Sequence, residues 1–270
     1  MSTALPVVTS RVGFVKDYVS HGINGLFFQK GDSFSLAKEL ESLINSKQLR
    51  DRLAENARHT IVHKFDWDLT GMRFVDFFEH YFENGSKEDI IEVLKKYQNE
   101  DGGFGNSLEP DFRLPDSSPM ATSIGLRYIY QINGHKRAEK MVKSAIDYLE
   151  KEYNEKRKGW YALSEKVNDY PHTPWWHYDL EKGMTVIDQN WGNPSAEIIA
   201  YLYKYQDVVK ELDINYLLDY TIYYLDRKEK FNSENEVYCY LKLYNILRKN
   251  YLKKVEKNLA RAIRQVLETN

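Results

Sequence analysis

Hydrophobic residues recur at helical spacing along the later two-thirds of the chain. Two clear examples are Met141-Ala145-Tyr148-Leu149 and Val237-Leu241-Tyr244-Leu247. Side chains three or four positions apart share one face of a helix, so each run predicts an amphipathic helix that buries one side. The pattern predicts helices over about 87–99, 118–133, 135–153, 193–206, 213–229, 234–249 and 251–268. Alternating short and long connections between these helices favour stacked helical hairpins.

The first 85 residues follow a different pattern. Short β-branched or aromatic runs at 6–10 and 26–28 predict two buried strands, and the glycines of 21–25 predict a turn between them. Apolar residues at helical spacing then predict helices over about 33–45, 48–63 and 66–82. Two parallel strands and three helices cannot cover both faces of a sheet, so we expect these strands to be partly exposed.

A polar turn at 83–86 separates the two patterns. It contains Gly85, and Ser86 caps a new helix with Asp89 three residues later. We therefore expect one domain over 1–84 and a second over 85–270.

Composition narrows the class of protein. Apolar residues make up 42% of 270 residues, enough for a core, and the formal net charge of −2 favours neither nucleic acid nor a membrane surface as partner. The single cysteine, Cys239, excludes an internal disulfide and favours a reducing compartment. No signal peptide or long apolar run is present, so we expect a cytoplasmic protein. The sequence predicts no cofactor and no metal.

The first segment resembles a known family through the runs PVVTSRVGFVKDYVSHGINGLFFQKGD, SLAKELESLI, LRDRLAENAR and FDW. In order and spacing, residues 1–82 are similar to the C-terminal end of retaining GT-B glycosyltransferases. The resemblance implies part of a Rossmann-like nucleotide-sugar domain. It places the family's donor-site glutamate upstream of Met1, so the expectation is a truncated, inactive remnant. Only Thr9 and Ser10 correspond to donor-side positions, and in this truncated context a plain strand-to-loop cap is the favoured explanation for them.

The second segment also carries a resemblance. The run QNEDGGFG after the first helix, and the inner helix that opens with SSPMATS, resemble the α/α toroid of terpene cyclases and protein prenyltransferases. LEPDFRLPDSSPMATS and YPHTPWW are similar to an uncharacterised bacterial toroid group. The implied fold class is mainly α: a partial toroid preceded by the small α/β fragment. About 185 residues supply only three or four of the six hairpins of a full toroid, so the barrel is expected to be an open arc or to close by homo-oligomerisation.

Two Pro-stiffened loops carry the candidate chemistry. Glu109 and Asp111 flank Pro110, and paired carboxylates can divide acid and base roles, with Arg113 as a nearby substrate-binding residue. The alternative is a solvated loop that caps the next helix. The second loop offers His172 and His177 as titratable groups, and Trp175, Trp176 and Tyr178 as a platform for a sugar or an isoprene. The alternative is a structural plug at the toroid mouth.

Two further residues come from the stretch DQNWGNPSAE. Trp191 is expected to contact substrate, and Glu197 lies one turn inside the following helix. Glu197 either faces the cavity or pairs with a surface lysine, and Glu236 is similarly placed on a later helix. Cys239 lies within a helix, where a buried apolar role suits it. No DxDD, P-loop, GxSxG or HExxH sequence occurs.

These observations leave several functions open. The leading hypothesis is a toroid-type domain that binds or acts on a small carbohydrate or isoprenoid-like substrate. The first alternative is a non-catalytic helical scaffold that presents a concave surface to a partner. A second, based on resemblance alone, is transfer of sugar from a nucleotide sugar.

Overall fold

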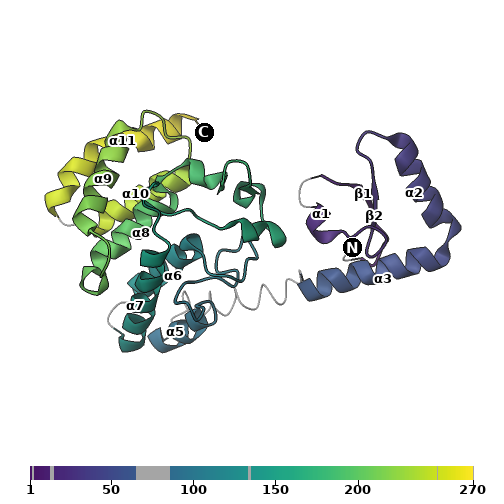
Figure 1. Cartoon of the computed structure of the whole chain (residues 1–270), viewed down its shortest axis with the longest axis horizontal. Coiled ribbons are helices and arrows are strands. Elements are labelled where there is room, and N and C mark those ends of the chain that lie inside the picture. Colours follow the sequence, from purple (N-terminus) through teal and green to yellow (C-terminus); the bar gives the residue numbers. More distant parts are fainter. Residues whose placement is uncertain (2, 13–14, 65–85, 133–134, 248, 270) are drawn as a thin grey trace. The chain divides into compact units, whose positions relative to one another are not determined.

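The computed structural model describes residues 1, 3–12, 15–64, 86–132, 135–247 and 249–269. The chain divides into two compact units (Figure 1). The first unit is Met1–Ser86 together with Asp169–Pro174, and the helical unit is Lys87–Asn168 together with Trp175–Asn270. The turn expected at 83–86 and the helix expected over 66–82 lie almost entirely outside the described residues.

The first unit contains a small α/β arrangement. Strands β1 (Val8–Ser10) and β2 (Leu26–Phe28) pair in parallel, with Val8 opposite Leu26. Helix α2 (Ser33–Asn45) packs on both strands and on α3 (Lys47–Lys64). The strand and helix predictions are therefore confirmed to within two residues, whereas the short helix α1 (Val15–Tyr18) had not been predicted.

The core of this unit is thin. Leu26, Leu43 and Leu53 form its buried cluster, with Val8 and Leu49 partly buried against it. The residues of β1 are all only half-buried, as expected for a parallel pair that is not covered on both faces.

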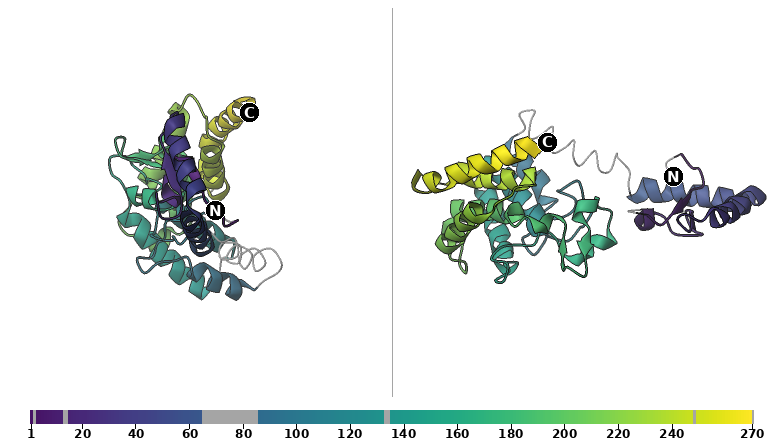
Figure 2. Two further views of the ribbon diagram at one scale, coloured as in Figure 1. Left: turned by 90° about the vertical axis from the view of Figure 1, so that its right-hand side faces the viewer. Right: turned by 90° about the horizontal axis from the view of Figure 1, so that it is seen from above.

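The helical unit is built from consecutive antiparallel pairs of helices. Its helices are α5 (Lys87–Lys95), α6 (Pro119–Gln131), α7 (Lys136–Lys151), α8 (Gly192–Lys204), α9 (Ile214–Arg227), α10 (Glu234–Ile246) and α11 (Lys249–Thr269). All seven predicted helices are present, with ends that differ by at most four residues. Helices α6 and α7, α8 and α9, and α10 and α11 pack as pairs, and α11 also packs against α9 (Figure 2).

Helix α8 lies at the centre of the helical unit. It packs against α6, α9 and α10, and every residue from Gly192 to Leu202 is buried. A helix that is buried on all sides needs apolar or internally paired side chains all round. This requirement explains why the polar residues of α8, including Asn193 and Glu197, must find partners within the unit.

The turn after α5 explains the glycine-rich run. Gly102 has φ of +93°, and a Cβ there would collide with the carbonyl oxygen of Ser144 on α7. Only glycine avoids both penalties. The Phe104 ring, which is fully buried, lies against Gly125 of α6. The turn thus joins α5 to the α6–α7 pair.

The long connection between α7 and α8 is more ordered than the sequence indicates. It contains 3-10 helices at Glu165–Asp169, Pro174–Trp176 and Ile187–Gln189, and a small antiparallel pair, β3 (Tyr178–Asp179) with β4 (Met184–Thr185). The buried Asp188 carboxylate accepts hydrogen bonds from Ala162 N, Thr185 N and Thr185 Oγ1. This carboxylate therefore holds Ala162 and Thr185 next to Asp188.

Candidate functional site

A cavity of about 330 Å³ opens within the helical unit. Its wall combines the loop before α6, the 3-10 helix Pro174–Trp176, and the facing sides of α6, α8 and α10. Its charged lining residues are Glu109, Asp111, Arg127, Glu197 and Lys242. Its aromatic lining residues are Trp175, Trp176 and Tyr238, and Met120, Ile187, Asn193, Asn235 and Cys239 complete it.

The two Pro-stiffened loops meet at this cavity. Glu109 and Asp111 come from one loop, and Trp175 and Trp176 come from the other. The rings of Phe112 and Trp176 pack edge to face, with centroids 5.3 Å apart. This contact holds the carboxylate pair and the tryptophan pair on a common wall although more than 60 residues separate them in sequence.

Glu109 has the most perturbed carboxyl group at the cavity. Burial raises its pKa from 4.5 to about 7, and the neighbouring Asp111 carboxylate acts in the same direction. The hydrogen bond from Asp111 N to Glu109 Oε1 and the charge of Arg127 partly oppose this shift. A carboxyl group that titrates near neutral pH can both give and accept a proton. Asp111, by contrast, is exposed.

Arg127 and Glu197 form an ion pair across the cavity floor. Arg127 Nε and Nη2 donate to the two carboxylate oxygens of Glu197 at 2.8 and 2.7 Å. Tyr201 Oη donates to Glu197 Oε1 at 2.9 Å. The Glu197 side chain is 2% exposed and that of Arg127 is 32% exposed, so the pair spans from the core to the cavity. The sequence left two positions open for Glu197, at the cavity or paired with a surface lysine. In the structure Glu197 lines the cavity, and its partner is Arg127.

Sequence reasoning had not selected Arg127. It is the single charged residue between Pro119 and Gln131, on a helix that is otherwise apolar or neutral. A lone charge on a largely buried helix must find a buried partner, and this signal could have identified it.

Cys239 is buried at the cavity wall, as expected. Its Sγ lies 3.6 Å from Asn193 Oδ1 and 4.0 Å from Glu197 Oε2. Burial, with the Glu197 carboxylate adding to it, raises the thiol pKa well above its ordinary value. A thiol held in its protonated form is a poor nucleophile.

Several candidate residues lie elsewhere. Trp191 is buried against Tyr220 and Tyr224, and its Nε1 donates to the Arg157 carbonyl oxygen. Tyr178 belongs to β3, and its backbone N–H donates to Asn168 Oδ1. These residues, together with Arg113 and the exposed His177, are not among those that line the cavity.

Two more candidates, His172 and Glu236, are buried away from the cavity lining. His172 is buried and lies in Asp169–Pro174, a segment of the first unit, so it is not part of the unit that contains the cavity. Glu236 is fully buried, accepts a hydrogen bond from Gly192 N and pairs with Lys228 Nζ at 2.7 Å. In the first unit, Thr9 Oγ1 donates to the Ser10 carbonyl oxygen at the end of β1, as a simple strand end would.

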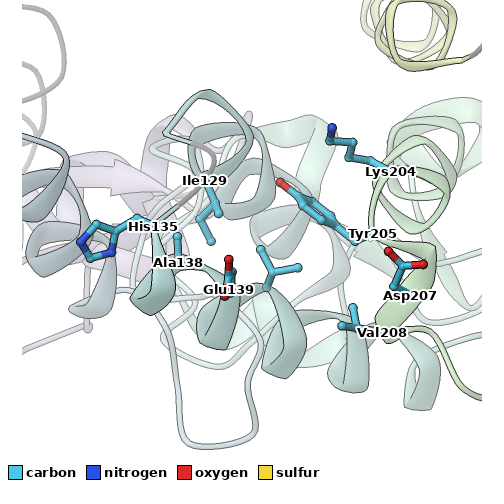
Figure 3. Close-up of a pocket in the computed structure, with 9 residues that line it drawn as sticks. Ile129, His135, Ala138, Glu139, Lys204, Tyr205, Asp207 and Val208 are labelled. Atoms are coloured by element: carbon cyan, nitrogen blue, oxygen red, sulfur yellow. The ribbon is translucent and has the colours of Figure 1, made fainter.

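A smaller cavity of about 150 Å³ lies between the start of α7 and the end of α8 (Figure 3). Ile129, Ala138 and Val142 give it an apolar floor, and Glu139 and Lys204 lie at its rim. The Tyr205 hydroxyl is buried there without a hydrogen-bond partner among the described residues. None of the candidate residues lines it.

The described ranges of the chain contain no group of three or more His, Cys, Asp or Glu side chains placed to hold a metal ion. None of the helices described is both long enough and apolar enough to span a bilayer.

Comparison with known proteins gives matches to glycosyltransferases. Residues 1–60 match the family described as glycosyl transferases group 1. An uncharacterised glycosyltransferase of Methanocaldococcus jannaschii is 35% identical over 77 residues, which is 28% of this chain and 22% of that protein. The capsular polysaccharide biosynthesis glycosyltransferase CapM of Staphylococcus aureus is 36% identical over 61 residues, 23% of this chain and 16% of CapM.

The chain thus spans less than a quarter of the length of these relatives. No solved structure matches the chain. The resemblance of the first segment to glycosyltransferases is therefore supported at the level of that family, and the chain as a whole combines a small glycosyltransferase-like α/β segment with a mainly helical unit.

Proposed function

We propose that the helical unit binds a carbohydrate in the cavity between α6, α8 and α10, and that Glu109 transfers a proton to or from it. The observation that carries this proposal is the Glu109 carboxyl group, which lies at the cavity wall and has a pKa of about 7. Perturbed carboxyl groups in clefts are candidates for acid–base catalysis because both protonation states are populated at neutral pH.

The composition of the wall favours a carbohydrate over an isoprenoid. Trp175 is 43% exposed and offers a flat apolar face, whereas Asn193, Asn235 and Lys242 offer hydrogen-bonding groups beside it. A sugar presents both an apolar face and a ring of hydroxyl groups, so it matches such a wall. An isoprenoid chain would leave the charged and amide groups without partners, at a cost for each buried one.

The glycosyltransferase-like segment gives independent support for carbohydrate chemistry. Similarity to glycosyl transferases group 1 over residues 1–60 indicates a role related to glycosyl transfer at the level of the family. Transfer of sugar from a nucleotide sugar by this chain remains the second candidate function. Titration of the purified protein with UDP-glucose and GDP-mannose tests it, and the absence of binding to nucleotide sugars would remove it.

The helix pairing also supports a partial α/α toroid as the architecture of the helical unit. Three consecutive pairs, α6–α7, α8–α9 and α10–α11, pack so that α6 and α10 flank α8. In such an arrangement the inner helices face a common hollow, and the loops at one end form its rim. The cavity has this composition, because α6, α8 and α10 supply its floor and two loops supply its rim.

A binding experiment tests the proposed function. The full chain is titrated with a panel of neutral and acidic oligosaccharides by ligand-observed NMR. Trp175→Ala is expected to weaken binding about tenfold or more, because an aromatic platform contributes on the order of 1–3 kcal/mol of stacking energy. Tyr223→Ala, at an exposed aromatic on α9, is the matched control. If no sugar of the panel binds, the non-catalytic scaffold becomes the better explanation.

The catalytic part needs a separate measurement. The rate of turnover of a bound sugar, measured by the release of product, should change with pH around 7 in the parent protein. Glu109→Gln should lose this dependence on pH. Binding without any turnover would leave a carbohydrate-binding domain and exclude the enzyme.

A further inference from the structure

Two cationic side chains at the cavity have donors that no described residue uses. Arg127 uses Nε and Nη2 for Glu197, and its third nitrogen, Nη1, has no hydrogen bond with a described residue. Lys242 forms neither an ion pair nor a side-chain hydrogen bond within the described ranges.

The two cationic side chains line one cavity of about 330 Å³, Arg127 from α6 and Lys242 from α10. Both are partly exposed to solvent, so a ligand that enters the cavity can reach them. Charge-assisted hydrogen bonds from guanidinium and ammonium groups are strongest to anionic oxygens, so the acceptor that suits both side chains is an oxyanion.

The charge balance of the cavity limits that oxyanion to a single charge. Glu197 neutralises Arg127 through its two-point ion pair, which leaves Lys242 as the cation without a buried counter-charge. Asp111 is exposed to water, and Glu109 adds negative charge whenever it ionises. A dianionic phosphate would be repelled by these carboxylates, whereas a monoanion is matched by Lys242.

From these observations we propose that the carbohydrate bound at this cavity is an acidic sugar, of the hexuronic acid class, whose carboxylate is bound by Arg127 and Lys242. This inference rests on the proposed carbohydrate-binding function and specifies its ligand. The apolar face of the sugar ring lies on Trp175, and the carboxylate points to the cationic side of the cavity.

Proton linkage follows from the same arrangement. The charged groups that act on Glu109 are Asp111 and Arg127, and Glu109 in turn acts on Tyr128. A bound carboxylate adds another negative charge, and it therefore favours the protonated form of Glu109. Affinity for the acidic sugar should be highest below pH 7 and should fall as pH rises through about 7, because Glu109 then ionises beside the ligand.

Matched sugars provide the test. Methyl glucuronide and methyl glucoside differ only in a carboxylate or a hydroxymethyl group at C6, and the methyl galacturonide and galactoside form a second pair. The full chain is titrated with each at about pH 6 and about pH 8. At the lower pH we expect the uronide of at least one pair to bind about tenfold more tightly than its neutral glycoside, which is the gain that a charge-assisted hydrogen bond provides. At about pH 8, where glucose 6-phosphate is a dianion, it should bind more weakly than the glucuronide.

Variants identify the residues involved. Lys242→Gln should abolish the preference for the uronide, and Lys242→Arg should restore it. Lys140→Gln removes the same charge from an exposed position on α7 and should leave the preference unchanged. Glu109→Gln should remove the dependence on pH while keeping the preference. Since none of these changes strands a buried charge, each variant is expected to fold, and circular dichroism verifies this.

The outcomes separate the two proposals. Equal binding of uronide and neutral glycoside, or a preference that survives Lys242→Gln, overturns the acidic-sugar inference and leaves the carbohydrate site intact. A higher affinity for glucose 6-phosphate than for the glucuronide also overturns it. Failure of every sugar in the wider panel to bind overturns both.

Discussion

The two units of this chain differ in how much information their sequence motifs and their cores carry. The first unit has the family resemblance, over residues 1–60, but its buried cluster among the described residues consists of Leu26, Leu43 and Leu53. The helical unit has a fully buried central helix and a cavity with paired charges and aromatic residues. A recognisable motif therefore does not mark where the chemistry of a chain lies, and buried polar groups are the better guide here.

The largest expected effect is on the core of the helical unit. Trp160 is fully buried, and its Nε1 donates to the Leu149 carbonyl oxygen at 2.7 Å. Trp160→Ala should lower the free energy of unfolding by about 3–5 kcal/mol, because it leaves a large cavity and an unpaired carbonyl. Leu53→Ala in the first unit should cost less, about 2–3 kcal/mol, since its thinner core can collapse around the gap. Urea denaturation followed by far-UV circular dichroism measures both, and equal losses would contradict the difference in core depth.

The next effect concerns the ion pair at the cavity floor. Arg127→Ala removes the partner of Glu197, whose carboxylate is 2% exposed, and should cost about 3 kcal/mol at neutral pH. Lys47 and Asp51 form an exposed pair on α3, so Lys47→Ala should cost at most about 1 kcal/mol. The same denaturation assay compares them. A loss below about 1 kcal/mol for Arg127→Ala would mean that Glu197 is reached by water.

A smaller effect is a change of stability with pH. The pKa of Glu109 is raised from 4.5 to about 7 in the folded chain, so folding favours its protonated form. This contribution is complete below about pH 4.5 and is lost as pH rises through about 7. Glu109→Gln should therefore be more stable than the parent at pH 8, and its stability should vary less between pH 5 and pH 8. Thermal unfolding across this range measures it, and parallel curves for the two proteins would refute the assignment.

The smallest effects come from helix caps, one in each unit. Ser118 caps α6 through its hydroxyl and is buried, whereas Asp32 caps α2 at a half-buried position. Ser118→Ala should cost about 1–2 kcal/mol, and Asp32→Ala about 0.5–1 kcal/mol, because water can replace the lost acceptor more easily at the less buried cap. Urea denaturation measures both, and a larger loss for Asp32→Ala would reverse this order.

Local patterns in the sequence predicted the helices well. Apolar periodicity gave the position of every helix in the helical unit, and Ser118 with Pro119 marked the start of α6. The same reasoning asked whether Glu109, Asp111, His172 and Trp176 converge on one cavity. Glu109, Asp111 and Trp176 line one cavity, His172 is not among its lining residues, and the roles of all four remain predictions.

Long-range pairing was beyond such patterns. The Arg127–Glu197 pair joins residues 70 positions apart, and Asp188 organises its loop through contacts with Ala162 and Thr185. Each depends on how helices or loops pack, which no local spacing encodes. His172 and Trp191 were chosen for residue type alone, and their type suits burial as much as ligand binding.

The reaction rate of the single thiol of the chain reports on the packing around the cavity. Cys239 is enclosed between α8 and α10, with its proton held in place by a buried carboxylate nearby. Cys239 is 5% exposed and lines the cavity, so a disulfide reagent reaches it either through the cavity or when the two helices separate. A ligand that fills the cavity should therefore slow the rate of labelling in native buffer in proportion to its occupancy.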